Sequence, residues 1–314
     1  MFPRQAKLFI QKYAFLAACV GMAITGLTVL SFLVDIHRFR FPERSIFYIA
    51  ACQLLYVVPY FARRFLNHEQ MACNKIGLAE RMILVDGGLD NSVCVVSAVF
   101  THYFWTAGCL WWLMLTFTWY LSASRKWVQE EIEKRATYLH LISWGVAAFS
   151  TIFVLITQNV DANELTGICG VGFLHFETFV GVVVAPQLFI LLFGLVFAIL
   201  GFGSLRKQKQ CFKHRGTDTS KLDKFITKMS LFTLIYVLTM VAVLIGDGYH
   251  AHILRKWYPA TIGCKMNGGA DRGMCRRPPQ PEVVFYVVRT LRNSGGISVT
   301  YAANPDQWKA SKVV

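Results

Sequence analysis

Six long apolar stretches, each almost free of charge, constrain this chain more than any other feature. They cover residues 14–34, 45–62, 93–121, 138–156, 179–203 and 229–250. A bilayer core of about 30 Å needs roughly 20 apolar residues in a helix, so each stretch is long enough to cross it. Only 16% of the 314 residues are charged, whereas an average soluble domain has about 25%. The sequence therefore predicts an all-α, polytopic membrane helix bundle rather than a soluble domain, a disordered chain or a small disulfide scaffold.

A seventh candidate span, 282–303, is degenerate. It contains Glu282, Arg289, Arg292 and Asn293 among its apolar residues. A charged residue at the bilayer centre costs about 3 kcal/mol on insertion scales. We therefore expect this segment to need polar neighbours or a water-filled cavity in order to insert.

The distribution of Lys and Arg predicts the orientation. The loop 204–228 carries eight basic residues, whereas the loop 157–178 carries none. Because dense basic loops stay on the cytoplasmic side, we place the loops 35–44, 122–137 and 204–228 inside and the N-terminus outside. The first stretch is also longer than the core of a typical signal peptide, which favours a span over a cleaved leader.

The cysteines fit this orientation. Cys19, Cys52 and Cys109 lie within the apolar stretches, where thiols pack as small apolar groups, and Cys211 lies in the basic loop. The other five are all on the predicted outer side, which fits an oxidising exterior; they are Cys73, Cys94, Cys169, Cys264 and Cys275. A bridge from Cys94 to Cys169 would tie a loop over the bundle mouth, and Cys264 and Cys275 could bridge locally.

Motifs for catalysis are not found in the sequence. It has no Walker A loop, no H-E-x-x-H and no G-x-S-x-G, so we expect no enzyme, no cofactor and no metal site. The net charge of +14 is assigned to cytoplasmic loops rather than to a nucleic-acid-binding face. The alternative from another class is a membrane enzyme or transporter. Its only support is the set of polar residues inside the apolar stretches, which are His102, His140, Gln187 and Asp247. These residues do not cluster by sequence spacing.

Several segments occur in a specific order along the chain. Among them are DIHRFRFPERSIFYIAACQ (35–53), GLDNSVC (88–94), YFWTAGCLWWLMLTFTWYLSASRKW (103–127), ELTGICGVG (164–172), GFGSLRKQK (201–209), DTSKLDKFITKMSLFTLIYVL (218–238) and CKMN (264–267). Together, over roughly residues 15–300, they resemble the Frizzled family of seven-helix Wnt receptors. The paired Trp111 and Trp112, followed by Leu-Thr-x-Thr-Trp, are the most specific of these features.

The resemblance implies a seven-transmembrane bundle, like class F G-protein-coupled receptors, with a degenerate seventh helix. Such a receptor acts in Wnt signalling at the plasma membrane and relays an outer signal to Dishevelled, to heterotrimeric G proteins, or to both. The layout would be a short extracellular stub (1–13), a Frizzled-type transmembrane domain (14–303) and a short tail (304–314). Further expected partners are a Wnt protein, a membrane lipid such as a sterol, and another receptor in an oligomer.

The resemblance implies functional roles for residues of this chain at the positions where it matches the family's motifs. Cys94 and Cys169 match the family's disulfide between helix three and the second outer loop, and Lys228 matches the basic residue of its activation switch. The three inner loops match the surfaces that engage cytoplasmic partners, and their basic charge also suits anionic headgroups. The residues expected there are Arg38, Arg40, Arg44, Arg125, Lys126, Trp127, Arg206, Lys207, Lys209, Lys221 and Lys224.

Three departures from the family pattern define a second reading. The sequence shows no ten-cysteine Wnt-binding domain, and Cys73 matches the cysteine that in the family pairs with the linker below that domain. The tryptophans of helix seven and the Lys-Thr-x-x-x-Trp motif that docks Dishevelled are also missing. The alternative is therefore a truncated or divergent Frizzled that does not signal and acts as a decoy or as a partner of full-length receptors.

Overall fold

The computed structural model describes residues 2–34, 41, 44–66, 71–76, 81–86, 89–214, 219–266 and 279–294. Within these ranges, six helices are long and apolar enough to cross a membrane. They are α1 (Arg4–Val34), α2 (Arg44–Ala62), α4 (Ser92–Arg125), α6 (Ala136–Ile156), the continuous helix Phe176–His214, and Ile226–Cys264 within α9 (Ser220–Met266). The helix Phe176–His214 consists of α7 (Phe176–Thr178), the π-helical η2 (Phe179–Val184) and α8 (Ala185–His214). The six predicted spans are confirmed.

Three helices extend well beyond their predicted apolar stretches; the fifth was expected to end at residue 203, but α8 continues to His214. The first span was expected from residue 14, but α1 begins at Arg4. The sixth was expected to end at residue 250, but α9 continues to Met266 and is 47 residues long. Hydropathy identifies only the part of a helix that lies in the bilayer. The helix ends outside the lipid carry charged residues, so the apolar criterion does not include them.

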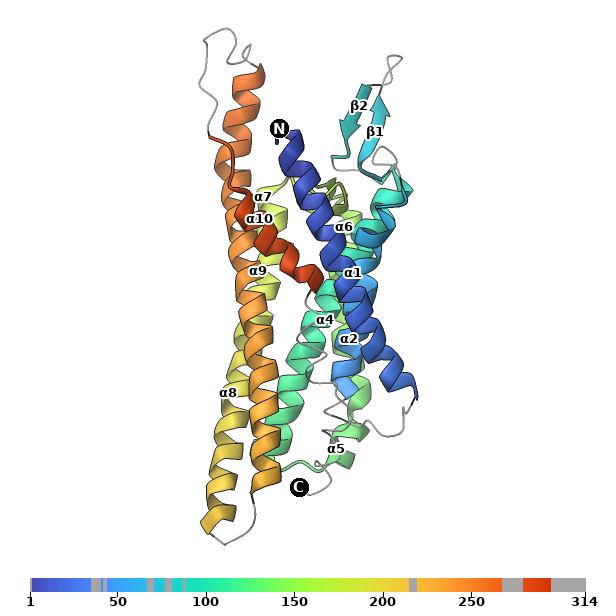
Figure 1. Cartoon of the computed structure of the whole chain (residues 1–314). Helices are drawn as coiled ribbons and strands as arrows, with labels where there is room; N and C mark the ends of the chain where they lie inside the picture. The colour runs from blue at the N-terminus through green and yellow to red at the C-terminus, as the bar shows by residue number, and fades with distance from the viewer. Residues whose placement is uncertain are drawn as a thin grey trace.

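The elements divide between two ends of an elongated bundle (Figure 1). One end, called the cap end, holds the start of α1, the antiparallel pair β1 (Cys73–Ile76) and β2 (Arg81–Leu84), and the C-terminal end of α9. It also holds the antiparallel pair β3 (Val160–Ala162) and β4 (Cys169–Val171). The other end, called the loop end, holds the short α5 (Gln129–Lys134), the C-terminal end of α8 and the start of α9; α8 and α9 run side by side there and extend farther than α5.

The core is centred on α4, which packs against α2, α6 and α8. Trp111 and Trp112 of α4 are fully buried. Trp111 stacks on Tyr48 of α2 with ring centroids 4.2 Å apart, and Trp112 stacks on Tyr236 of α9 at 4.6 Å. The paired tryptophans therefore hold three helices together through large apolar contacts on two neighbouring faces of α4.

The outward faces of the helices are strongly apolar. Several large side chains are more than half exposed, among them Leu16, Leu27, Phe149, Phe189 and Ile199. Exposed apolar surface on this scale indicates contact with a membrane. The chain is thus a multi-pass membrane protein whose outward faces meet lipid.

The seventh segment is short and does not form a full span in its described part. It consists of α10 (Val283–Arg289) and the 3₁₀ turn η4 (Thr290–Ser294), and residues 295–303 of the expected helix lie outside the described residues. We call 283–294 the wedge segment, because it crosses obliquely between α1 and α9 (Figure 1). Glycines allow this approach: a Cβ at Gly21 would lie 2.2 Å from the Asn293 carbonyl oxygen, and one at Gly246 would lie 3.0 Å from that of Phe285.

The packing of Trp112 gives a test of the core. A Cβ added at Gly194 of α8 would lie 2.1 Å from the Trp112 ring, whereas one at Gly203 of the same helix meets nothing within 4 Å. Gly194→Ala should therefore lower the stability of the purified protein by about 1–3 kcal/mol through overpacking. Gly203→Ala should be neutral or stabilising, since alanine favours a helix over glycine. Thermal unfolding of both variants in the same detergent makes the comparison, and equal midpoints would contradict this packing.

Candidate functional site

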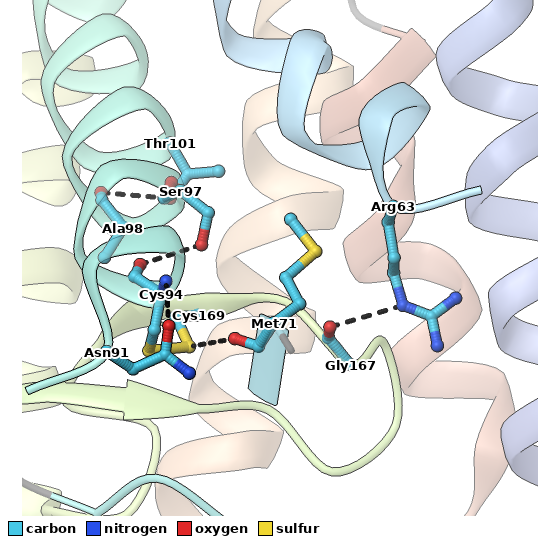
Figure 2. Close-up of a disulfide and its surroundings, with 9 residues drawn as sticks. All are labelled: Arg63, Met71, Asn91, Cys94, Ser97, Ala98, Thr101, Gly167 and Cys169. Atoms are coloured by element: carbon cyan, nitrogen blue, oxygen red, sulfur yellow. Dashed lines mark hydrogen bonds between the residues drawn. A yellow bond between two sulfur atoms is a disulfide. The ribbon is translucent and has the colours of Figure 1, made fainter. Parts of the chain in front are cut away.

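The cap end is closed by a hairpin that a disulfide joins to the core helix. This hairpin cap comprises residues 160–171, with β3, β4 and the turn between them. Cys169 of β4 is bonded to Cys94 in the first turn of α4, with an S–S distance of 2.02 Å (Figure 2). Asn91 caps the same turn, because its side chain accepts a hydrogen bond of 3.0 Å from the Cys94 amide. The structure thus links the two cysteines that the family resemblance pairs. The start of α4, where the disulfide is attached, is fixed by the Asn91 cap.

The turn of the hairpin cap is held by local hydrogen bonds. The Asn163 side-chain oxygen accepts hydrogen bonds from the amides of Leu165 and Thr166, at 2.9 and 3.3 Å. Gly167 has a φ of 66°, a conformation that favours glycine, and the Arg63 guanidinium packs closely against it. Arg63, just beyond α2, donates a hydrogen bond of 3.3 Å to the Gly167 carbonyl (Figure 2). The turn is therefore tied to the end of α2.

The start of α1 holds the other side of the turn. Glu164 forms a 2.7 Å salt bridge with Lys7 and accepts a 3.1 Å hydrogen bond from the Phe2 amide. Gln11 donates a hydrogen bond of 3.3 Å to the Leu165 carbonyl. Burial alone raises the pKa of the Glu164 carboxyl, but the hydrogen bonds from Lys7 and Phe2 outweigh it and hold the pKa below its usual value. The hairpin cap is thus fixed to α1, α2 and α4, and it covers the mouth of the bundle.

The remaining expected disulfide is only partly described. Cys264 is buried on the last turns of α9 and is disulfide-bonded. Cys275 lies outside the described residues, so its pairing with Cys264 stays a prediction.

The loop end gathers many of the basic residues expected to bind partners. Lys126 terminates α4 in the left-handed conformation, with a φ of 55°, and the Arg135 guanidinium lies 4.5 Å above the Trp127 ring. Helix α8 is held against the end of α4, because Ser204 and Gln208 both donate hydrogen bonds to the Ala123 carbonyl, at 2.7 and 2.9 Å. These contacts set the basic residues of two segments on one end of the bundle.

The exposure of these basic residues differs. Lys209 forms a 2.5 Å salt bridge with Asp223 of α9, so part of its charge is neutralised. Arg44 is half-buried at the start of α2, and Lys221 lies on α9. Arg38 and Arg40 lie outside the described residues. The exposed cations at this end include Arg125, Lys126, Arg206, Lys207 and Lys224.

Lys228, the expected switch residue, lies half-buried near the loop end of α9. Its neighbour Met229 is buried in the main core. The structure records no hydrogen bond or ion pair from the Lys228 ammonium to any residue it describes. Its role in switching therefore stays a prediction.

A buried charged cluster near the cap end was missed by the sequence reasoning. Asp247 of α9 is 0% exposed and pairs with both arginines of the wedge segment, with Arg289 Nε at 2.8 Å and Arg292 Nη2 at 2.5 Å. Arg292 also donates a 3.4 Å hydrogen bond to Gln187, and its carbonyl accepts one of 2.7 Å from Gln53. The expectation that the seventh segment needs polar neighbours is confirmed, and Asp247 is the main one.

The other polar residues inside the spans divide into two groups. His102 lines the same cavity as Arg292, whereas His140 lies apart and accepts a 3.2 Å hydrogen bond from Trp144. Sequence spacing could not reveal these groups, because their members come from different helices.

A small polar cluster lies beside the hairpin cap. Potential ligand atoms of Asp86, Asp161 and His175 all lie within 4.8 Å of one another. Asp161 already accepts a 3.3 Å hydrogen bond from the Leu174 amide, and His175 lies 3.3 Å from Asp86. Because His175 pairs with Asp86 and the Leu174 amide bonds to Asp161, these groups have partners without an ion, and the expectation of no metal site is kept as a prediction.

Comparison with known proteins gives one family. Residues 1–301 match the protein family described as the Frizzled/Smoothened family membrane region. The chain is 34% identical over 244 residues to Frizzled-4 of Homo sapiens, which covers 78% of this chain and 45% of that protein. It is 33% identical over 289 residues to human Frizzled-10 (91% and 49%) and 35% identical over 233 residues to Frizzled-9 of Gallus gallus (74% and 59%). The chain spans about half the length of the curated relatives it matches.

The disulfide should contribute substantially to the stability of the cap end. Replacing both cysteines, as Cys94→Ser with Cys169→Ser, should lower the free energy of unfolding by about 2–4 kcal/mol, because a long loop in the unfolded chain is no longer closed. Cys211→Ser, at an exposed free cysteine of the loop end, is the control and should leave the midpoint unchanged. Thermal unfolding in detergent, with and without reductant, measures the difference. A double variant as stable as the control would show that the disulfide does not support the cap.

The Glu164 salt bridge predicts a dependence of stability on pH. Because the folded-state pKa of Glu164 lies below its unfolded value, its contribution is complete above the ordinary carboxyl pKa of about 4.3 and is lost as the pH falls through the lowered value. Glu164→Gln should therefore lower the unfolding midpoint near neutral pH and reduce its fall between about pH 5 and 3. Glu130→Gln, at an exposed carboxylate of α5, should keep the full pH dependence. Parallel curves for Glu164→Gln and the unaltered protein would refute this role.

Proposed function

Because this chain belongs to the Frizzled/Smoothened family, we propose that it is the membrane region of a Frizzled-type receptor in Wnt signalling. The observation that carries the proposal is the family match over residues 1–301, supported by six candidate spans. Frizzled proteins are signalling receptors rather than enzymes. The mechanism is accordingly a shift between conformations, and an outer partner drives it only by binding one conformation more tightly.

We place the protein in the plasma membrane with its N-terminus and cap end outside. Two independent features support this orientation. The dense basic loop 204–228 belongs to the loop end, and Lys/Arg-rich loops stay in the cytoplasm. The Cys94–Cys169 disulfide belongs to the cap end, and disulfides persist in an oxidising exterior. In this layout 14–303 is the transmembrane domain and 304–314 is a cytoplasmic tail, while the expected stub 1–13 is largely the first turns of α1.

The loop end is the surface we assign to cytoplasmic partners. Its exposed cations come from the end of α4, the C-terminal part of α8 and the start of α9, at Arg125, Lys126, Arg206, Lys207 and Lys224. A patch of this charge suits an acidic face of Dishevelled or of a G protein, and it also suits anionic lipid headgroups. Lys228 at the same end of α9 is the proposed switch residue, because its position couples movement of α9 to this patch.

The outer partner we propose is a Wnt protein, as expected for the family. The hairpin cap and the start of α1 form the part of the described cap end that such a partner would meet, since they are fixed to each other by Glu164 and Lys7. A stable cap suits signal transfer, because force applied to it reaches α1, α2 and α4 together. A receptor oligomer, also expected, would be formed through the apolar outward faces.

Recruitment of Dishevelled tests the proposal. In cells without endogenous Frizzled, the full chain should bring labelled Dishevelled to the plasma membrane. Reversing two adjacent charges at the loop end, as Arg206→Glu with Lys207→Glu, should reduce this recruitment several-fold at equal surface expression. The matched control is Arg255→Glu with Lys256→Glu, two adjacent exposed residues at the cap end of α9, which should leave recruitment unchanged.

Two results would contradict the proposal. If the unaltered chain reaches the cell surface but neither recruits Dishevelled nor activates a G protein, it does not signal through the usual partners. Co-precipitation with a complete Frizzled would then support a decoy. If both charge reversals reduce recruitment equally, the loop end is not the specific partner surface.

A further inference from the structure

The charged cluster inside the bundle is not balanced. Asp247 is one carboxylate, and it faces two guanidinium groups, those of Arg289 and Arg292. Arginine does not lose its proton in proteins, so both remain cationic. Both residues are only 9% exposed. Among the residues that the structure describes, the cluster therefore carries an excess of one positive charge where water is largely excluded, and an uncompensated charge is costly at such a site.

Some of the guanidinium N–H groups also lack hydrogen-bond acceptors. Nη1 of Arg289 and Nε of Arg292 are buried and have no hydrogen-bond partner among the residues the structure describes. Aromatic rings lie nearby, with the Arg292 guanidinium 4.3 Å above Trp105 and that of Arg289 4.8 Å above Phe173. Rings attract a cation but do not replace a strong acceptor, so the two arginines retain unused donors.

Both arginines line a cavity beneath the hairpin cap. Its volume is about 60 Å³, and its walls come from α1, α2, α4, the hairpin cap, Phe173, η2 and the wedge segment, with Tyr56, Tyr60, His102 and Trp105 among the lining residues. Pockets for drug-sized ligands measure about 300–1,000 Å³, so the sterol expected from the sequence does not fit here. The space is sufficient for a small ion with a few waters.

We propose that this cavity binds a compact monovalent anion, either chloride or the carboxylate of a small acid, between Arg289 and Arg292. One such anion neutralises the excess charge and accepts hydrogen bonds from the guanidinium groups of the two arginines that line the cavity. A charged acceptor is the strongest partner for a guanidinium. The sequence also supports a special role for these two residues, because the family resemblance implies apolar residues at both arginine positions.

The anion has a structural consequence. Arg289 ends α10 and Arg292 lies in η4, so both anchor the wedge segment between α1 and α9. Binding to the folded protein alone raises its stability with the logarithm of the ratio of anion concentration to the dissociation constant, once that ratio exceeds one. The wedge segment should thus be held more firmly when the anion is bound, whatever partner the receptor engages.

The test measures the stability of the purified full chain in detergent as chloride replaces gluconate at constant ionic strength. The midpoint of thermal unfolding should rise with chloride and keep rising with the logarithm of its concentration once the site is saturated, because the ion binds only the folded chain. Formate in place of chloride distinguishes the two sources: a rise with formate alone indicates a carboxylate ligand, and a rise with chloride alone indicates a halide. Equal midpoints in gluconate, chloride and formate would overturn the proposal.

Variants show whether the rise belongs to this cavity. Arg292→Gln leaves one arginine for Asp247, which removes the excess charge, and should abolish the dependence on the anion. Arg255→Gln, at an exposed residue of α9, is the control and should retain it. If Arg292→Gln does not fold, Asp247→Asn provides the second variant, because it increases the excess charge and should lower the half-saturating concentration at least tenfold.

A direct measurement separates site binding from general salt effects. Equilibrium dialysis of the full chain with radioactive chloride should give one bound ion per chain, displaced by excess unlabelled chloride but not by gluconate. If formate rather than chloride raised the midpoint, radioactive formate takes its place. No binding of either ion, or full binding to Arg292→Gln, would overturn the assignment. These outcomes are independent of Dishevelled recruitment, so the two proposals fail separately.

Discussion

The ion pairs of Asp247 determine where the last described part of the chain can lie. A charged arginine inside a bilayer costs about 3 kcal/mol on insertion scales, and the wedge segment carries two. Asp247, with no exposed surface, provides the opposite charge at 2.8 and 2.5 Å. Glycines in α1 and α9 remove the side chains that would otherwise keep the segment away. Charge and close backbone approach therefore act together, and either alone would leave the segment without a stable position.

The spans could be predicted from sequence because their signal is local. An apolar run of sufficient length needs no knowledge of its neighbours, and all six runs became helices. The helix ends could not be predicted in the same way. Residues 4–13 of α1 and 251–266 of α9 contain charges that the apolar criterion counts against a span, yet both segments are helical. Their helical form depends on continuation from the membrane part and on contacts such as Lys7 with Glu164.

The site contacts could be predicted only where a family pattern supplied the partner. The resemblance paired Cys94 with Cys169, which are 75 residues apart, whereas spacing alone left that pairing as one option. Asp247 was noted as a polar residue inside a span, and Arg289 and Arg292 as defects in the seventh helix. Their mutual pairing depends on how α9 and the wedge segment pack, which one sequence does not reveal. Similarly, Lys209 was read as part of a basic patch, and Asp223 beside it was not recognised as its partner.

The length of α9 has a mechanical consequence. Its 47 residues form a continuous helix about 70 Å long at 1.5 Å per residue, more than twice the roughly 30 Å of a bilayer core. Pro259 lies about two turns from the Cys264 end of this helix, so the longer part before it forms one lever with its pivot in the membrane. A tilt of about 5° around its midpoint moves each tip by about 3 Å. One tip of α9 carries Cys264, and the other lies beside the end of α8. A tilt too small to disturb the packing of the core at the pivot therefore displaces both tips by about the length of a hydrogen bond.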